Sequence, residues 1–280
     1  MKLKRTTKKQ LATAMFAVAA LGSAKADSLF WAVNQFTTVH QLNGDTGAVV
    51  DSFAVPFLNN GRAASIAVVG NVGYYTILED ANVYKVDMTT HAYLGVAFNT
   101  GDSTSMNGIT VDSNAHLWFA HGDGAALQEF DTSGVLLSTH AFPVPAFAYR
   151  DGSVVYGGNL VANRGDQMGP YDKYAIGAGN AALTYTAQPF IVDPVQDSGN
   201  NGIAFNGVNF YVSNEQLHRV AKYDVNGVYI SDAPLDGSSR YENWTFASQD
   251  IVPPVPDTSS TLALLSASAI GLIIAGRRNR

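Results

Sequence analysis

The sequence contains no cysteine in its 280 residues, which excludes a disulfide framework, a thiolate metal site and a cysteine nucleophile. Basic residues are scarce as well. Of 17 Lys and Arg, six lie in residues 2–25 and three in residues 277–280, which leaves eight for the rest of the chain. All 23 acidic residues lie between Asp27 and Asp257, so that segment carries a formal charge of −15. Because such a charge repels nucleic acid and anionic lipid, we expect no nucleic-acid partner.

Long hydrophobic runs are absent from the body of the chain and occur only near its ends. Five basic residues precede an apolar run over residues 11–21, and Ala24-Lys25-Ala26 follows it. This order is typical of a secretory signal peptide over residues 1–26 that signal peptidase cleaves before Asp27. The N-terminal segment therefore predicts export.

The other end has three parts. A short polar segment over residues 255–261 begins with Val255-Pro256-Asp257, an apolar stretch covers residues 262–276, and a basic cluster covers residues 277–280. The uncharged stretch from Thr258 to Gly276 is close to the ~20 residues that cross a bilayer. We expect a transmembrane helix with its arginines on the cytoplasmic side. The alternative is a buried C-terminal helix of a soluble domain.

This tail resembles the PEP-CTERM sorting signal in its Val-Pro-Asp-Ser-Gly variant. Val255, Pro256 and Asp257 match, whereas Thr258 and Ser259 stand in place of the Ser-Gly. The resemblance implies a Gram-negative source, tail processing by an exosortase and an association with exopolysaccharide and biofilm matrix. The implied location is the inner membrane transiently, and then the cell surface or the extracellular space.

The body, residues 27–254, lacks helical periodicity and contains short β-branched and aromatic runs between turn residues. The pattern recurs. The turn residues Asp87, Asp131 and Asp224 are 44 and 93 residues apart, one and two periods. Four strands repeating about every 45 residues predict an all-β fold, the β-propeller. The copy at residues 108–134 resembles NHL-type propeller repeats.

The first copy begins at its second strand, near Leu29, and lacks an inner strand. The segment Asn243–Ala247 is a candidate for that strand, which would close the ring and remove an exposed edge. Second strands at Leu29, Tyr74, Leu117, near Val155 and at Phe210 predict five four-stranded blades. A sixth blade stays open as an alternative, because the region from Pro143 to Gln196 is long.

In a propeller, the loops after the second and fourth strands of each blade share one face, where ligands commonly bind. We expect the ligand site on this face, among Asn60, Arg62, Glu79, Asp80, Asn107, His121, Asp123, Asn201, Asn214 and Glu215. The alternative is that these polar residues are chosen for turn geometry alone, as Asn-Gly pairs commonly are.

Motifs for catalysis are missing from the sequence: it contains neither Gly-x-Ser-x-Gly nor His-Glu-x-x-His. We therefore favour a non-enzymatic, exported surface or matrix protein that binds polysaccharide or other surface components through one propeller face. The alternative is a secreted carbohydrate- or lactone-active hydrolase that uses funnel carboxylates or bound calcium. We expect no cofactor; calcium is the alternative, because Asp193, Asp197, Asn200 and Asn201 could offer it oxygen ligands.

Overall fold

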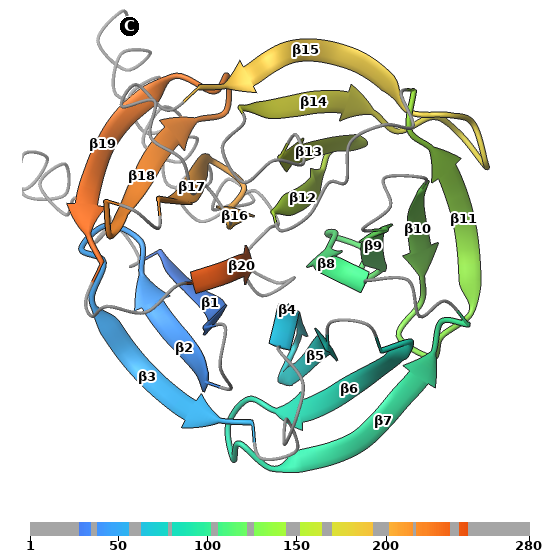
Figure 1. Ribbon diagram of the computed structural model, residues 1–280, viewed down its shortest axis with the longest axis horizontal. Helices are drawn as coiled ribbons and strands as arrows, with labels where there is room; N and C mark the ends of the chain where they lie inside the picture. Colours follow the sequence, from blue (N-terminus) through green and yellow to red (C-terminus); the bar gives the residue numbers. More distant parts are fainter. Residues whose placement is uncertain are drawn as a thin grey trace, which may run out of the picture.

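The computed structural model shows five four-stranded antiparallel sheets arranged as blades around a central axis (Figure 1). The structure describes residues 28–34, 38–55, 63–77, 80–101, 106–121, 126–143, 152–163, 170–192, 202–214, 217–235 and 241–245. The all-β propeller with five four-stranded blades is therefore confirmed, and the alternative of six blades is wrong.

Each blade runs outward from an inner strand to an outer strand. Blade 1 consists of β20 (Tyr241–Thr245), β1 (Leu29–Asn34), β2 (Thr38–Asn43) and β3 (Val49–Ala54). Blade 2 consists of β4 (Ala63–Val69), β5 (Val72–Ile77), β6 (Asn82–Asp87) and β7 (Tyr93–Asn99). Blade 3 consists of β8 (Met106–Val111), β9 (Leu117–His121), β10 (Ala126–Phe130) and β11 (Leu136–Ala141). Blade 4 consists of β12 (Ser153–Tyr156), β13 (Asn159–Asn163), β14 (Tyr171–Ala175) and β15 (Thr184–Ile191). Blade 5 consists of β16 (Ile203–Phe205), β17 (Asn209–Asn214), β18 (Arg219–Asp224) and β19 (Tyr229–Pro234).

The C-terminal strand β20 completes the N-terminal blade, as the missing inner strand of the first repeat predicts. It pairs antiparallel with β1, with Trp31 opposite Thr245 and Asn34 opposite Tyr241. The pairing covers the edge of β1 that the first repeat would otherwise leave open. Next to this closure, Lys222 of blade 5 donates to the carboxylate of Asp45 in blade 1 at 2.6 Å.

The fourth blade corrects the predicted strand order. The sequence places a second strand near Val155, but the segment Ser153–Tyr156 is the inner strand β12. Its partner begins after a two-residue turn, because Gly157 and Gly158 both have positive φ angles and place Tyr156 opposite Asn159. Two-residue hairpins require such angles, which glycine adopts without strain.

The recurring aspartates cap the turns between the third and fourth strands. Oδ1 of Asp131 accepts the backbone N–H groups of Ser133 and Val135 and the hydroxyl of Ser133. Asp87 and Asp224 make the same kind of contacts in blades 2 and 5. These hydrogen bonds favour the ionised carboxylate, so the pKa of each is below its ordinary value, led in Asp131 by the bond from Ser133.

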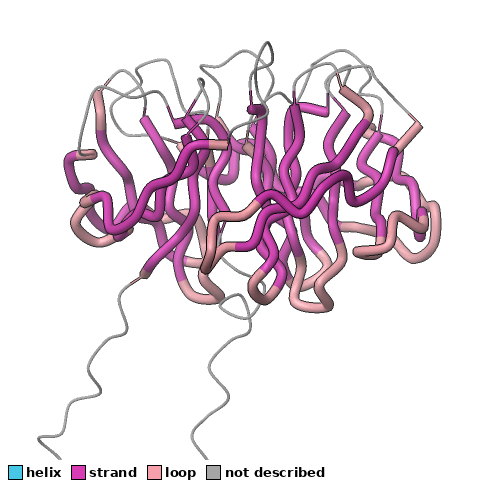
Figure 2. The backbone as a smooth tube through the Cα atoms, turned by 90° about the horizontal axis from the view of Figure 1, so that it is seen from below, coloured by secondary structure: helices cyan, strands magenta, loops and turns pink. Residues whose placement is uncertain are grey.

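The same turns touch the preceding blade. A methyl group added to Gly134 would lie 2.4 Å from Cβ of Phe98 on β7. One added to Gly227 would lie 2.4 Å from the carbonyl oxygen of Phe190, and one added to Gly47 would lie 1.9 Å from that of Pro234. At the corresponding place in blade 2, the His91 ring stacks on Phe53 with centroids 4.2 Å apart. These turns gather along one edge of the propeller (Figure 2). Each blade therefore rests its outer turn on the blade before it.

The core fills the spaces between neighbouring blades with aromatic and aliphatic side chains. Trp31, Tyr75 and Trp118 are buried there. Ser65 of β4 reaches across to β8, where its hydroxyl donates to the carbonyl of Ile109 and accepts its N–H. Neighbouring blades are thus joined by apolar side chains packed between them, and blades 2 and 3 also by these hydrogen bonds between their inner strands.

The two ends of the chain, residues 1–27 and 246–280, lie outside the described residues. The signal peptide and the sorting tail with Val255, Pro256 and Asp257 therefore stay predictions. Among the residues that are described, no helix is long and apolar enough to cross a membrane.

Candidate functional site

Two of the predicted ligand-binding residues have described side chains, and both bind their own turns. Asp80 accepts the N–H and the side-chain amide of Asn82 at 2.9 Å and also accepts the hydroxyl of Tyr84. Burial, reinforced by this hydrogen bond, raises the pKa of Tyr84 to about 12. Asn214 is buried, and its side-chain oxygen accepts the N–H of Leu217 at 2.9 Å. At these two positions the turn-geometry alternative accounts for the residue type.

The side chains of the other eight predicted residues lie outside the described part of the structure. Asn107 lies on β8 and His121 lies on β9, with only their backbones described. The remaining predicted residues lie outside the described residues: Asn60, Arg62, Glu79, Asp123, Asn201 and Glu215. The polar face that they define stays a prediction.

A cavity of about 500 Å³ lies between blades 3 and 4, at the opposite end of the propeller from that predicted face. Its walls come from the turn between β8 and β9, from β10 and β11, and from the two turns of blade 4 at Gly157–Gly158 and Gly177–Gly179. The inner part is formed by Trp118, His140 and Val155, all buried. A pocket of this volume is within the usual range for small ligands.

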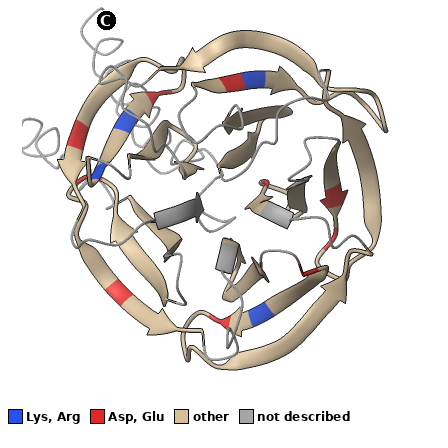
Figure 3. Cartoon of the chain, in the orientation of Figure 1, with Lys and Arg blue, Asp and Glu red and all other residues tan. Residues whose placement is uncertain are grey.

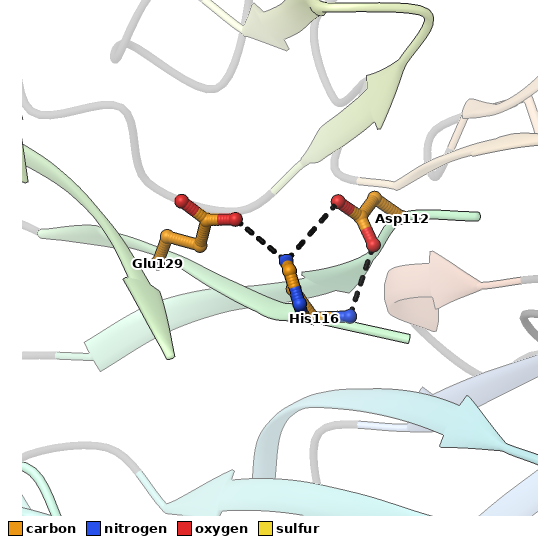
Figure 4. Close-up of side chains that lie close together, drawn as sticks. All are labelled: Asp112, His116 and Glu129. Atoms are coloured by element: carbon orange, nitrogen blue, oxygen red, sulfur yellow. Dashed lines mark hydrogen bonds and ion pairs between the residues drawn. The ribbon is translucent and has the colours of Figure 1, made fainter. Parts of the chain in front are cut away.

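Two titratable side chains of the cavity wall, Asp112 and Glu129, lie close to a third, His116 (Figure 4). Asp112 directly follows the inner strand β8, His116 precedes β9, and Glu129 lies on β10. The His116 ring nitrogen Nδ1 is 2.7 Å from Oε1 of Glu129 and 3.8 Å from Oδ2 of Asp112. The Asp112 and Glu129 side chains are only 12% and 17% exposed. Two carboxylates therefore face one imidazole.

The Asp112 carboxylate is held in a fixed orientation. Its Oδ1 accepts the backbone N–H groups of Asn114 at 2.8 Å and His116 at 2.9 Å, which shapes the tight turn. Its Oδ2 accepts the indole N–H of Trp118 at 3.2 Å and faces His116. Ala115 has a positive φ of 64°, which turns the chain sharply and places His116 back over Asp112.

Glu129 is tied to a second group of polar side chains in the cavity wall. Its Oε2 accepts the hydroxyl of Ser138 at 2.7 Å, and the same hydroxyl lies 2.9 Å from Nε2 of His140. The other nitrogen of His140 faces the carbonyl of Ala181 in blade 4 at 2.7 Å, so it carries a hydrogen. Ser138 therefore links Glu129 to His140 in one chain of hydrogen bonds. The cavity wall thus combines carboxylates with a hydroxyl and an imidazole.

The three residues of this cluster are absent from the predicted site, although the sequence holds a signal for them. Asp112 and His116 flank a hairpin turn, and the strand alternation places Glu129 opposite Trp118 in the adjacent pair of strands. Part of the far wall comes from the Gly157–Gly158 hairpin, about 45 residues further along, where the predicted strand order is wrong. Basic side chains of the described strands lie on three separate blades and gather into no stripe (Figure 3).

Comparisons with known proteins support the fold. No protein-family model matches the chain, and no curated protein sequence matches it. Among solved structures, a chain of a nidogen/laminin complex has a TM-score of 0.52 at 12% identity, covering 78% of this chain and 97% of its own. A protein of unknown function from Bacteroides caccae has a TM-score of 0.48 at 12% identity, covering 78% and 97%. A streptogramin B lyase has a TM-score of 0.46 at 14% identity, covering 81% and 72%. At such identities the likeness shows a β-propeller and carries no function.

Proposed function

We propose that the chain is an exported surface protein that binds a polar ligand, in the first place a polysaccharide, in the cavity between blades 3 and 4. The observation that carries this proposal is the concave site with fixed polar groups around it. Sugar hydroxyls both donate and accept hydrogen bonds. The acceptors of Asp112 and Glu129, oriented by Trp118 and Ser138, suit such hydroxyls without further ordering.

The shape of the cavity also favours a short stretch of a sugar chain. Glycines form the blade 4 side of its rim at Gly157, Gly158, Gly177 and Gly179, so a ligand can approach the backbone closely. The volume of about 500 Å³ and the polar wall match a ligand with many hydroxyl groups.

Delivery to the surface is the second part of the proposal, and the sequence alone supports it. The signal peptide over residues 1–26 and the PEP-CTERM-like tail over residues 255–280 together imply export, exosortase processing and an exopolysaccharide-rich environment. Before processing, the apolar stretch over residues 262–276 holds the protein in the inner membrane.

A secreted hydrolase acting on carbohydrate or lactone is the second candidate function. Two carboxylates, Asp112 and Glu129, have oxygens no more than 4.8 Å apart, and glycosidases act through a pair of carboxylic residues. Both carboxylates point at His116, however, and each is already hydrogen-bonded. This arrangement favours binding over proton transfer to a leaving group.

The test is binding of the full chain to a panel of bacterial polysaccharides, with assay of released reducing ends in the same samples. Replacing Ser113, an exposed residue at the cavity, by Trp should block binding. Val225 follows the turn aspartate of blade 5 in the same way but lies away from the cavity, so Val225→Trp is the matched control. Binding that survives Ser113→Trp would contradict the cavity as the site, and released reducing ends would favour the hydrolase.

A further inference from the structure

We propose that Asp112, His116 and Glu129 bind a divalent transition-metal ion of the zinc type in the cavity between blades 3 and 4. One ligand atom from each residue can be chosen so that all three lie within 4.8 Å of one another. The proposal goes beyond polysaccharide binding and does not depend on it, because the metal alone should bind.

The ligand set selects the class of metal. It offers one imidazole nitrogen and two carboxylate oxygens. Zinc and its neighbours bind nitrogen and oxygen together, whereas calcium and magnesium prefer oxygen ligands only. Three protein ligands beside a cavity leave a fourth position for water or a ligand, as in open zinc sites.

The distances suit an ion after small movements. Metal–ligand distances of ~2.0–2.2 Å in a tetrahedral site place ligand atoms ~3.4 Å apart. Here Nδ1 of His116 is 2.7 Å from Oε1 of Glu129 and 3.8 Å from Oδ2 of Asp112. The first distance is shorter than ~3.4 Å and the second is longer. Metal binding would replace the hydrogen on Nδ1, and Glu129 would move back by less than ~1 Å.

Residues outside the cluster hold the two carboxylates in place for a metal. Trp118 donates to Oδ2 of Asp112, and Ser138 donates to Oε2 of Glu129, which leaves Oε1 of Glu129 directed at His116. Partners of this kind orient ligands and tune their basicity in metal sites.

A buried histidine outside the cluster supports the position of Glu129. His140 is 1% exposed, lines the cavity, and has Nδ1–H directed at the carbonyl of Ala181. Its Nε2 lies 2.9 Å from the hydroxyl of Ser138, which in turn donates to Glu129. A chain of hydrogen bonds of this kind holds a carboxylate ligand in one orientation.

The experiment is titration of the full chain, stripped with EDTA, with zinc chloride by calorimetry. We expect one saturable site per chain, with calcium failing to compete. His116→Gln and Glu129→Gln should each weaken zinc binding roughly 100-fold or more, and Ser138→Ala roughly 10-fold, the range for a residue that orients a ligand. The control is His91→Asn, since His91 faces a single carboxylate, Asp51, at 3.2 Å.

A second measurement needs no variant and so does not depend on whether the variants fold. Histidines of the unmodified chain are acylated with diethyl pyrocarbonate with and without zinc and located by mass spectrometry. Zinc should protect His116 and leave His91 reactive. The absence of saturable zinc binding, preference for calcium, unchanged zinc affinity in folded His116→Gln and Glu129→Gln, or equal labelling of His116 with and without zinc would each overturn the proposal. Loss of polysaccharide binding alone would not affect it.

Discussion

The contact between Gly134 and the preceding blade leads to a quantitative prediction about how the ring is held together. Gly134 has a φ of +90°, and a methyl group built on it lies 2.4 Å from Cβ and 2.5 Å from Cγ of Phe98. Replacing Gly134 by Ala should cost about 1–2 kcal/mol for the left-handed backbone. Displacing Phe98 should add about 1–3 kcal/mol of overpacking. The sum is a large part of the 5–15 kcal/mol typical of a domain.

Urea unfolding followed by circular dichroism would measure this cost. Gly95→Ala is the matched control, because Gly95 has a φ of +99° but open space around its added methyl group. Gly95→Ala should lower the free energy of unfolding only by the cost of the left-handed backbone, about 1–2 kcal/mol. In a double-mutant cycle, Phe98→Gly should make Gly134→Ala less damaging, since the obstructing Cβ and Cγ atoms of Phe98 are both gone. Equal destabilisation by Gly134→Ala and Gly95→Ala would refute a close contact between the blades at this turn.

Two further predictions concern ionisable groups. The pKa of Asp131 is lowered in the folded protein, first by the hydrogen bond from the Ser133 side chain. The ionised carboxylate therefore stabilises the fold fully above its unfolded pKa of about 4. This stabilisation is lost as the pH falls through the folded pKa. Asp131→Asn should therefore destabilise the protein more at about pH 7 than at about pH 3 in urea titrations, and an equal effect at both would contradict the role of the charge. Burial is the larger cause of the raised pKa of Tyr84 and Asp80 the next, so Asp80→Asn should lower that pKa from about 12 while keeping it above the ordinary tyrosine value. NMR titration of labelled tyrosine would measure it, and an unchanged value would show that Asp80 has no part in the shift.

The fold could be predicted from the sequence because its signals are local and repeated. Turn caps at Asp87, Asp131 and Asp224 need only neighbouring backbone N–H groups, so their spacing shows the period directly. The missing inner strand of the first repeat indicated the closure by β20. Blade 4 lacks such an aspartate, and there a Gly157–Gly158 hairpin was mistaken for a later part of the repeat.

The cavity could not be predicted in the same way, because its groups meet only after folding. Asp112 and Glu129 are on different strands, and His140 meets Ala181 across a blade boundary, 41 residues along the chain. A repeat pattern predicts which residues are equivalent between blades, but it carries no information on which particular residues face a gap between two of them. The predicted polar face relied on loop position alone, and at Asp80 and Asn214 the polar groups serve their own turns.

The closure of blade 1 has a mechanical consequence. The chain enters the described structure at β1 and leaves it at β20, and these two strands are paired with each other. A pulling force applied at the C-terminal side of Thr245 therefore acts first on the hydrogen bonds between β1 and β20. The other four blades are pulled apart only after these hydrogen bonds break. The strength of the β1–β20 pairing thus sets the pull at Thr245 that the five-bladed ring withstands before it opens.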